Sequence, residues 1–196
     1  MVAVRPPVLV VYADGRVIAD AAHELRLPSA EVKVLVEALK QDLAGQPATA
    51  SPKPGSPRIY DVPTTVLGVA GGSGMREVHV PSLDHSAARY DAALVTARDR
   101  LAHLADRVAA QGWNYSTDRV RLSTEQVTAP ATSAKPLPEG VPLPPERQSH
   151  SGSKDYKGNK AHAIARLIPR DGSRHVYRTS TGNRIALSWR YLLPHE

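Results

Sequence analysis

Basic and aromatic residues are interleaved in the last quarter of the chain. Lys154, Lys157 and Lys160 recur every three residues, and six arginines follow them. A single-stranded nucleic-acid surface needs cations for the phosphates and flat rings on which the bases stack. Arginine and tyrosine also anchor protein partners. The candidate contact residues are Lys154, Tyr156, Lys157, Lys160, Arg178, Arg184 and Arg190.

The excess positive charge of the chain lies in the same segment. The 196 residues include 25 Lys/Arg and 19 Asp/Glu, a net charge of +6, and residues 151–196 hold nine of the basic and three of the acidic residues. Residues 1–150 are therefore neutral overall. A structural reading stays open, because basic residues often form an ordinary solvated face and Trp189 alternates with Leu187 as a core residue would.

The chain shows no sequence motif for catalysis or metal binding. It has no cysteine, which excludes disulfides, thiolate metal sites and a cysteine nucleophile. None of the eight histidines forms a metal-binding pair at helical spacing, and no Gly-x-Ser-x-Gly nucleophile motif occurs. We therefore predict no cofactor and no metal.

A glycine cluster in the first half of the chain has the composition of a phosphate-binding loop. Gly68, Gly71, Gly72 and Gly74 follow an apolar run. A phosphate loop must lead into a helix N-terminus, whereas residues 75–80 continue as a strand pattern and no Lys-Ser or Lys-Thr follows. The cluster therefore predicts a hairpin turn.

Three hypotheses about function follow from these patterns. The leading one is a non-enzymatic module that binds a macromolecule, in the first place another protein, through a sheet face or the basic C-terminal hairpin. The second is an accessory protein that binds nucleic acid through the basic segment. The third is a hydrolase or transferase with a site assembled from distant residues, for which the candidates are Asp61, Thr64, His79 and His85.

Turn and strand signals predict three β-hairpins that would position these residues. Asp14-Gly15 separates two apolar runs within residues 8–18, the glycine cluster separates residues 64–69 from 77–80, and Thr181-Gly182-Asn183 separates 176–177 from 185–189. The alternation in the last strand predicts Ile185, Leu187 and Trp189 on one face. Residues 113–122 alternate loosely and predict one more strand.

Helical periodicity predicts two long helices and a short one. The first spans residues 29–43, with Ser29 as N-cap and Gly45 as C-cap. The second has an apolar stripe and ends at Gly112. Residues 158–167 predict the short helix. The stripe of the second helix consists of Tyr90, Leu94, Ala97, Leu101, Leu104 and Val108, and its other face carries Arg98, Asp99, Asp106 and Arg107, predicted as solvated.

These elements predict an α+β fold, an antiparallel sheet built from hairpins in β-β-α units with two long helices on one face. We expect an α+β body over residues 1–128 and a proline-rich linker or packed strap over residues 129–150. A basic helix-hairpin unit over residues 151–196 would follow, either as a separate unit or as a part that completes the same sheet.

Three short stretches carry a resemblance to known proteins: residues 10–18 (VVYADGRVI), 61–65 (DVPTT) and 189–194 (WRYLLP). With the Ala, Arg and Pro bias, they resemble uncharacterised secreted or lipid-anchored proteins of high-GC actinobacteria, which implies binding rather than catalysis. This chain lacks an anchoring cysteine and an export signal in the sequence as written, so we expect a cytoplasmic protein, or a secreted one if the start is truncated. No run approaches the length of a membrane span.

Overall fold

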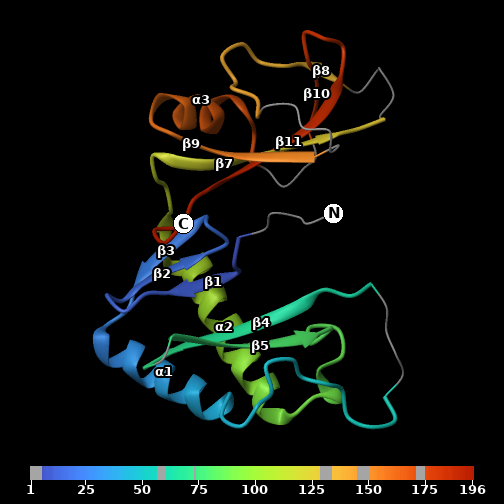
Figure 1. Cartoon of the computed structure of the whole chain (residues 1–196). Helices are drawn as coiled ribbons and strands as arrows, with labels where there is room; N and C mark the ends of the chain where they lie inside the picture. Colours follow the sequence, from blue (N-terminus) through green and yellow to red (C-terminus); the bar gives the residue numbers. More distant parts are fainter. Residues whose placement is uncertain (1–5, 57–60, 73, 129–133, 145–150, 171–174) are drawn as a thin grey trace. The chain divides into compact units, whose positions relative to one another are not determined.

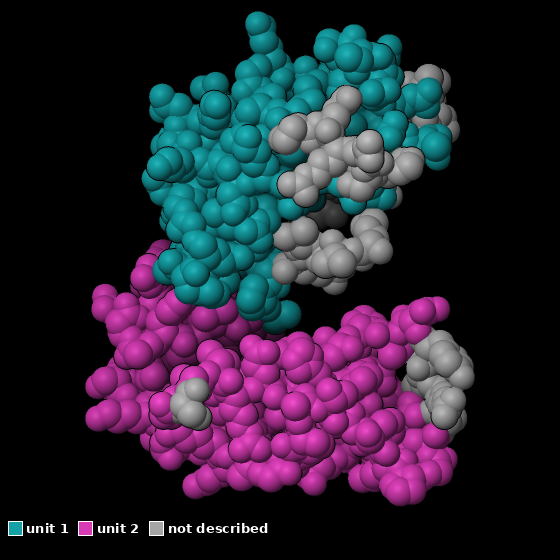
Figure 2. Space-filling view, in the orientation of Figure 1, with its two compact units in different colours: residues 1–8, 20–23, 114–196 teal, residues 9–19, 24–113 magenta. Residues whose placement is uncertain are grey.

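The structure is a computed structural model that describes residues 6–56, 61–72, 74–128, 134–144, 151–170 and 175–196. The fold class is α+β, as predicted, with helices and several antiparallel sheets (Figure 1). The chain divides into two compact units, shown in different colours in Figure 2. Unit 1 comprises residues 1–8, 20–23 and 114–196, and unit 2 comprises residues 9–19 and 24–113.

The first hairpin of the chain pairs β1 (Leu9–Val11) with β2 (Arg16–Ala19), with Leu9 opposite Ala19. This confirms the predicted Asp-Gly hairpin. Gly15 has a φ of +89°, and a Cβ there would lie 2.3 Å from the carbonyl oxygen of Leu27. Only glycine fits this turn without strain. The sheet continues through β3 (His23–Arg26) to β6 (Trp113–Asn114), in the order β1-β2-β3-β6.

Two long helices belong to unit 2. Helix α1 (Ser29–Asp42) begins after Pro28, so Ser29 is its first residue and not its N-cap, and the C-cap is Leu43 rather than Gly45. Helix α2 (Ala92–Gln111) is capped by the Asp91 carboxylate, which accepts a hydrogen bond from the amide of Ala93 at 2.8 Å. The helices contact each other, α2 also contacts β2, and α1 contacts β4.

The second predicted hairpin is confirmed and supplies much of the unit 2 core. Strand β4 (Thr64–Gly71) pairs with β5 (Gly74–Pro81) in an unbroken register that ends with Gly71 opposite Gly74. A short 3₁₀ helix (Ala87–Arg89) precedes α2. One hairpin face is buried against the stripe of α2, which explains the alternation of the strands. The buried hairpin residues are Leu67, Val69, Val78 and Val80.

Unit 1 contains a five-stranded sheet covered by a short helix. Its strands are β7 (Arg119–Gln126), β8 (Lys135–Pro136), β9 (Ser151–Lys157), β10 (His175–Arg178) and β11 (Arg184–Tyr191), in the order β8-β10-β11-β7-β9. Helix α3 (Asn159–Leu167) packs on β7 and β9. The core on this face includes Val120, Leu122, Ile164 and Leu187, with Ile185 and Trp189 packed at its margin.

The strands of the described residues form three sheets rather than the one sheet predicted. The predicted placement of two long helices on one face of a single sheet is therefore not confirmed. Turn residues specify a local hairpin but not the strand beside it, which is why sheet membership was not readable from the sequence. The units divide near residue 114, so β7 joins the C-terminal hairpin instead of the preceding body.

Part of the proline-rich stretch lies within the structure. Residues 134–144 pack against unit 1: β8 pairs in parallel with β10, and Val141 is buried in the core. The remainder of the predicted linker, residues 129–133 and 145–150, lies outside the described residues. Within the described parts of the chain, no helix has the length and apolar character needed to cross a bilayer.

Candidate functional site

The basic residues predicted to form one surface are spread along the unit 1 sheet. Lys157 is paired with Arg119 at one end of β7, and Arg184 precedes the residue paired with Gln126 at the other end. Seven residues of strand separate these ends, a distance of about 23 Å. Lys157 and Lys160 are exposed near the first end, Lys154 is exposed opposite Leu122 in the middle of β7, and Arg178 and Arg184 lie together at the second end.

Arg190 is not a surface contact, which corrects the sequence interpretation. Arg190 is only 7% exposed. Two nitrogens of its guanidinium donate hydrogen bonds to the two carboxylate oxygens of Glu196, each at 2.6 Å. Glu196 also accepts from the amide of Leu193 at 2.9 Å. The hydrogen bonds from Arg190 lower the pKa of Glu196 from 4.5 to about 2. The positive charge of Arg190 is therefore neutralised inside the fold.

A second ion pair lies beside it on the same sheet face. Arg121 is opposite Arg190 on β7 and donates to both carboxylate oxygens of Asp155 on β9, at 2.6 and 2.9 Å. The hydrogen bond from Arg121 lowers the pKa of Asp155, and the same bond raises the pKa of Arg121. Asp155 and Glu196, two of the three acidic residues in 151–196, are thus paired with Arg121 and Arg190 inside the fold.

The aromatic residues of the segment belong mostly to the core. Tyr156 and Tyr177 are buried, and Trp189 packs against the same core and donates its indole N–H to the carbonyl of Ile168 at 2.8 Å. A buried ring cannot stack on a nucleic-acid base. Tyr156 is therefore corrected as a contact residue, although the ammonium of Lys154 lies 5.6 Å from its ring.

Arg170 has a structural role that the sequence analysis missed. Its guanidinium lies 5.5 Å from the ring of Trp189 and 5.6 Å from that of Tyr191, and it donates to the carbonyls of Asp20 and Ala21 at 3.0 and 2.9 Å. Asp20 and Ala21 have φ values of 50° and 48°, a conformation that non-glycine residues rarely adopt. No sequence pattern links residue 170 to residues 20 and 21.

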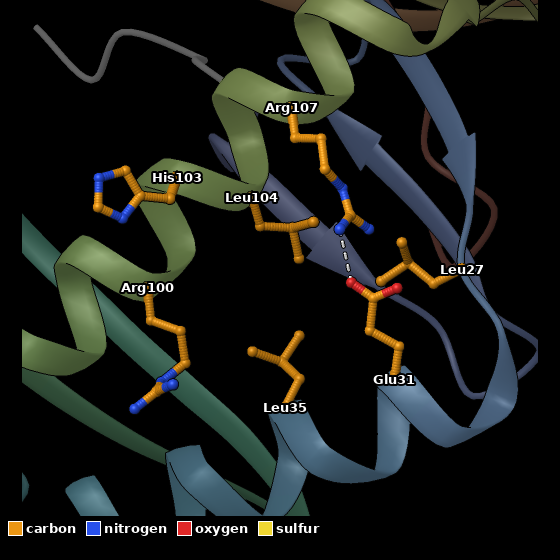
Figure 3. A pocket seen from close by; sticks show the side chains of 7 residues that line it. All are labelled: Leu27, Glu31, Leu35, Arg100, His103, Leu104 and Arg107. Atoms are coloured by element: carbon orange, nitrogen blue, oxygen red, sulfur yellow. Dashed lines mark ion pairs between the residues drawn. The ribbon is translucent and has the colours of Figure 1, made fainter.

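A pocket of about 270 Å³ lies in unit 2 between α1 and α2 (Figure 3). Leu104 and Arg107 point from α2 toward α1, where Leu35 and Glu31 face them. Arg107 donates to Glu31 at 2.7 Å, so it is not simply a solvated residue of α2 as predicted. The full lining is Leu27, Glu31, Leu35, Arg100, His103, Leu104 and Arg107.

The chemistry of this pocket is limited by ion pairs that already exist. Arg107 is paired with Glu31, and Arg100 lies 3.4 Å from the carboxylate of Asp42. An anionic ligand would have to displace these carboxylates. The leucines of the lining provide only a small apolar surface for a ligand. The lining contains no Ser, Thr, Cys or Lys that a base could activate.

The residues of the hydrolase hypothesis do not line this pocket. Thr64 and His79 lie on the exposed face of the β4–β5 hairpin, and His79 is 3.6 Å from Glu77. Asp61 is exposed and has a φ of 54°, and His85 follows a turn after β5. Among the described residues, no group of three or more His, Asp or Glu is placed to hold a metal ion.

The edge of β4 that faces away from β5, called the outer edge, offers main-chain groups rather than side chains as a binding site. On the far side of the hairpin, β5 is covered by residues 48–50: the amide of His79 donates to Ala48 at 2.8 Å, and the amide of Ala50 donates to His79 at 2.9 Å. Within the part of the chain that the structure describes, β4 has no strand other than β5 (Figure 1). The edge of β5 is therefore covered at His79, whereas no described main chain pairs with the other edge of β4.

The register identifies the main-chain groups that the open edge presents. Because His79 uses both its N–H and its C=O toward residues 48–50, the pair Val66–His79 is a non-hydrogen-bonded pair. Val66 therefore directs its own N–H and C=O away from β5. Alternate residues of a strand do the same, so the groups of Thr64, Gly68 and Ala70 also point outward. All four residues are exposed.

The open edge lacks the features that protect edge strands from pairing. Its sequence, TTVLGVAG, has no charge and no proline, and the unbroken register shows no bulge. Natural sheets protect open edges with lysine, proline, bulges or very short strands. The sequence predicted this segment only as part of a hairpin, although an uncharged run of eight residues, four of them β-branched, was the available signal.

Comparisons of the chain with protein-family models, curated proteins and solved structures found no match. The resemblance to exported actinobacterial proteins thus stays a prediction. The function is therefore inferred from the geometry of the chain itself.

Proposed function

We propose that this protein is a non-enzymatic module that binds polypeptide, and that the outer edge of β4 receives an extended segment by β-strand addition. The observation that carries the proposal is the row of outward N–H and C=O groups on Thr64, Val66, Gly68 and Ala70, to which the described residues offer no main-chain partner. In strand addition, such groups supply affinity through main-chain hydrogen bonds.

The residue at the centre of this edge supports the proposal. A Cβ at Gly68 would lie 3.5 Å from the sulfur of Met75 and 3.6 Å from Cγ of Glu77, which is ordinary van der Waals contact. The fold of the hairpin therefore does not require glycine here. Glycine inside a strand often marks a place where another backbone approaches closely.

The basic segment supports binding of a protein or of a nucleic acid less strongly than the β4 edge supports binding of a polypeptide. The cations of the segment are spread along the unit 1 sheet, Arg190 is neutralised by Glu196, and two of its aromatic rings are buried in the core. A nucleic-acid surface would need these cations and rings on one accessible face. The β4 edge has its outward groups in one continuous row.

The proposal is tested with linear peptides selected from a random display library on the full chain. We expect the selected peptides to lose affinity by about tenfold or more in Gly68→Pro, which removes one outward N–H and leaves the bonds to β5 intact. Gly68→Ala is the matched control: it keeps the N–H and adds only a methyl group, so it should lose much less affinity than Gly68→Pro. Titration by isothermal calorimetry measures both, with thermal melting to verify folding.

Hydrogen exchange locates the bound peptide. The amides of Val66, Gly68 and Ala70 have no acceptor in the isolated hairpin, so they should exchange fast and become protected when peptide binds. Peptides that bind Gly68→Pro as tightly as the wild type, or that protect other amides instead, would contradict the proposal.

A further inference from the structure

We propose that the polypeptide received by the β4 edge is the same strand of a second copy, so that two chains form a continuous antiparallel sheet β5-β4-β4-β5. This inference rests on the proposed function and names the partner of that site. The two strands would be related by a two-fold axis, since the same edge serves both copies. The structure supplies three observations that favour a second copy over an unrelated segment.

The first observation concerns the side-chain sizes of the four residues whose main-chain groups point away from β5. With the axis at Leu67, the outward residues pair as Val66 with Gly68 of the partner and Thr64 with Ala70 of the partner. Each larger side chain then faces a small one on the exposed face. This register uses all four outward residues of both strands and forms about eight main-chain hydrogen bonds.

The second observation is the charge of the edge. Like charges directly opposite each other destabilise a strand pair, and edge lysines prevent pairing between copies for this reason. Residues 64–71 contain no Lys, Arg, Asp or Glu, so β4 does not repel a copy of itself. The adjacent β5 carries one cation and one anion, Arg76 and Glu77, and adds no net repulsion.

The third observation is the exposure of apolar side chains on the same face. Val66 is 48% exposed and Met75 is 64% exposed. They lie on the same side of the hairpin, because Val66 is opposite His79 and Met75 is opposite Ala70. A two-stranded sheet is marginal by itself, whereas a four-stranded sheet brings apolar residues of both copies beside each other.

Sedimentation velocity of the full chain over a concentration series tests the inference. We expect a reversible dimer, weakened by about tenfold or more in Val66→Lys. In the proposed register, the two lysines introduced at position 66 are diagonal neighbours across the axis, about 7–8 Å apart, and repel each other. Val34→Lys is the matched control: it makes the same substitution at an exposed valine of α1, outside the proposed interface, and it should keep the dimer.

Hydrogen exchange and peptide binding separate this inference from the proposed function. In the wild type, the amides of Val66, Gly68 and Ala70 should gain protection as the chain concentration rises. A chain that stays monomeric at about 1 mM, or a dimer that persists in Val66→Lys, overturns the inference. The proposed function stands or falls separately, because a neutral selected peptide should still bind Val66→Lys and should compete with dimer formation in the wild type.

Discussion

Arg190 and Glu196 form a paired contact in which both carboxylate oxygens accept hydrogen bonds from one guanidinium, at 2.6 Å each. The pair lies on the sheet face opposite α3, next to Arg121 and Asp155. Alternation along β11 places Arg190 on the side away from Trp189, where its guanidinium pairs with Glu196. Arg190, one of the seven predicted contact residues, therefore has a structural role.

The Glu196 pair makes stability depend on pH in the acidic range. The folded pKa of Glu196, about 2, lies below its ordinary value of 4.5, so the unfolded chain binds a proton first as pH falls. The stabilisation is complete above about pH 4.5 and is lost as the pH falls toward 2. Urea unfolding of the wild type between pH 7 and pH 2 should show this loss.

Glu196→Gln isolates the contribution of this carboxylate. The variant cannot titrate at position 196, so its unfolding free energy should be lower than that of the wild type at pH 7 and should approach it at pH 2. Asp155 still titrates in both proteins, with its pKa lowered by the hydrogen bond from Arg121. A constant difference between the two proteins across the range would show that Glu196 is not held ionised by Arg190.

Removing the Arg170 guanidinium should destabilise unit 1. Arg170→Ala loses two ring contacts and two hydrogen bonds to the carbonyls of Asp20 and Ala21, an expected cost of about 1–2 kcal/mol in the free energy of unfolding. Arg166→Ala on α3 is the control, because Arg166 is exposed and the change removes the same charge. Chemical denaturation compares them, and equal stability of the two variants would remove the role assigned to Arg170.

The sequence predicted local elements well and long-range arrangement poorly. The hairpins around Gly15 and Gly71 and the stripe of α2 follow from turn chemistry and periodicity, which act over a few residues. The strand that lies beside each hairpin depends on packing between distant segments, so the division into three sheets was not predictable. The contacts of Arg170 with residues 20 and 21 also join distant segments of the chain, so they were not predictable either.

The candidate site was only partly readable for a related reason. A count of charges identified the basic segment but could not show which arginines Asp155 and Glu196 pair with, because these partners depend on strand register. The open edge of β4 could not be predicted from the sequence, because the contact of residues 48–50 with β5 decides which side of the hairpin is open. Charge composition gives the number of cations in a segment, while the fold decides how many of them stay available.

The apolar stripe of α2 should show a gradient of sensitivity to substitution. Leu94 is fully buried in the unit 2 core, whereas Leu101 is only partly buried at its margin. Leu94→Ala should cost about 2–5 kcal/mol, and Leu101→Ala clearly less, because a partly exposed site leaves a smaller cavity. Thermal and urea unfolding measure both variants, and a larger loss at position 101 would mean that the buried face of the helix is misassigned.

Gly15 and Gly45 allow the effect of a close backbone approach to be separated from the effect of a positive φ. Both have positive φ, +89° and +73°, but a Cβ at Gly15 would lie 2.3 Å from the carbonyl oxygen of Leu27, while nothing lies within 4 Å of a Cβ at Gly45. Gly45→Ala should therefore cost about 1–2 kcal/mol, the penalty of a left-handed alanine. Gly15→Ala should cost more, since the turn must also move away from Leu27, whose amide donates to the carbonyl of Gly15 at 2.8 Å. Urea unfolding of the two variants checks the difference, and equal losses would show that the approach of Leu27 to the turn contributes nothing to the requirement for glycine.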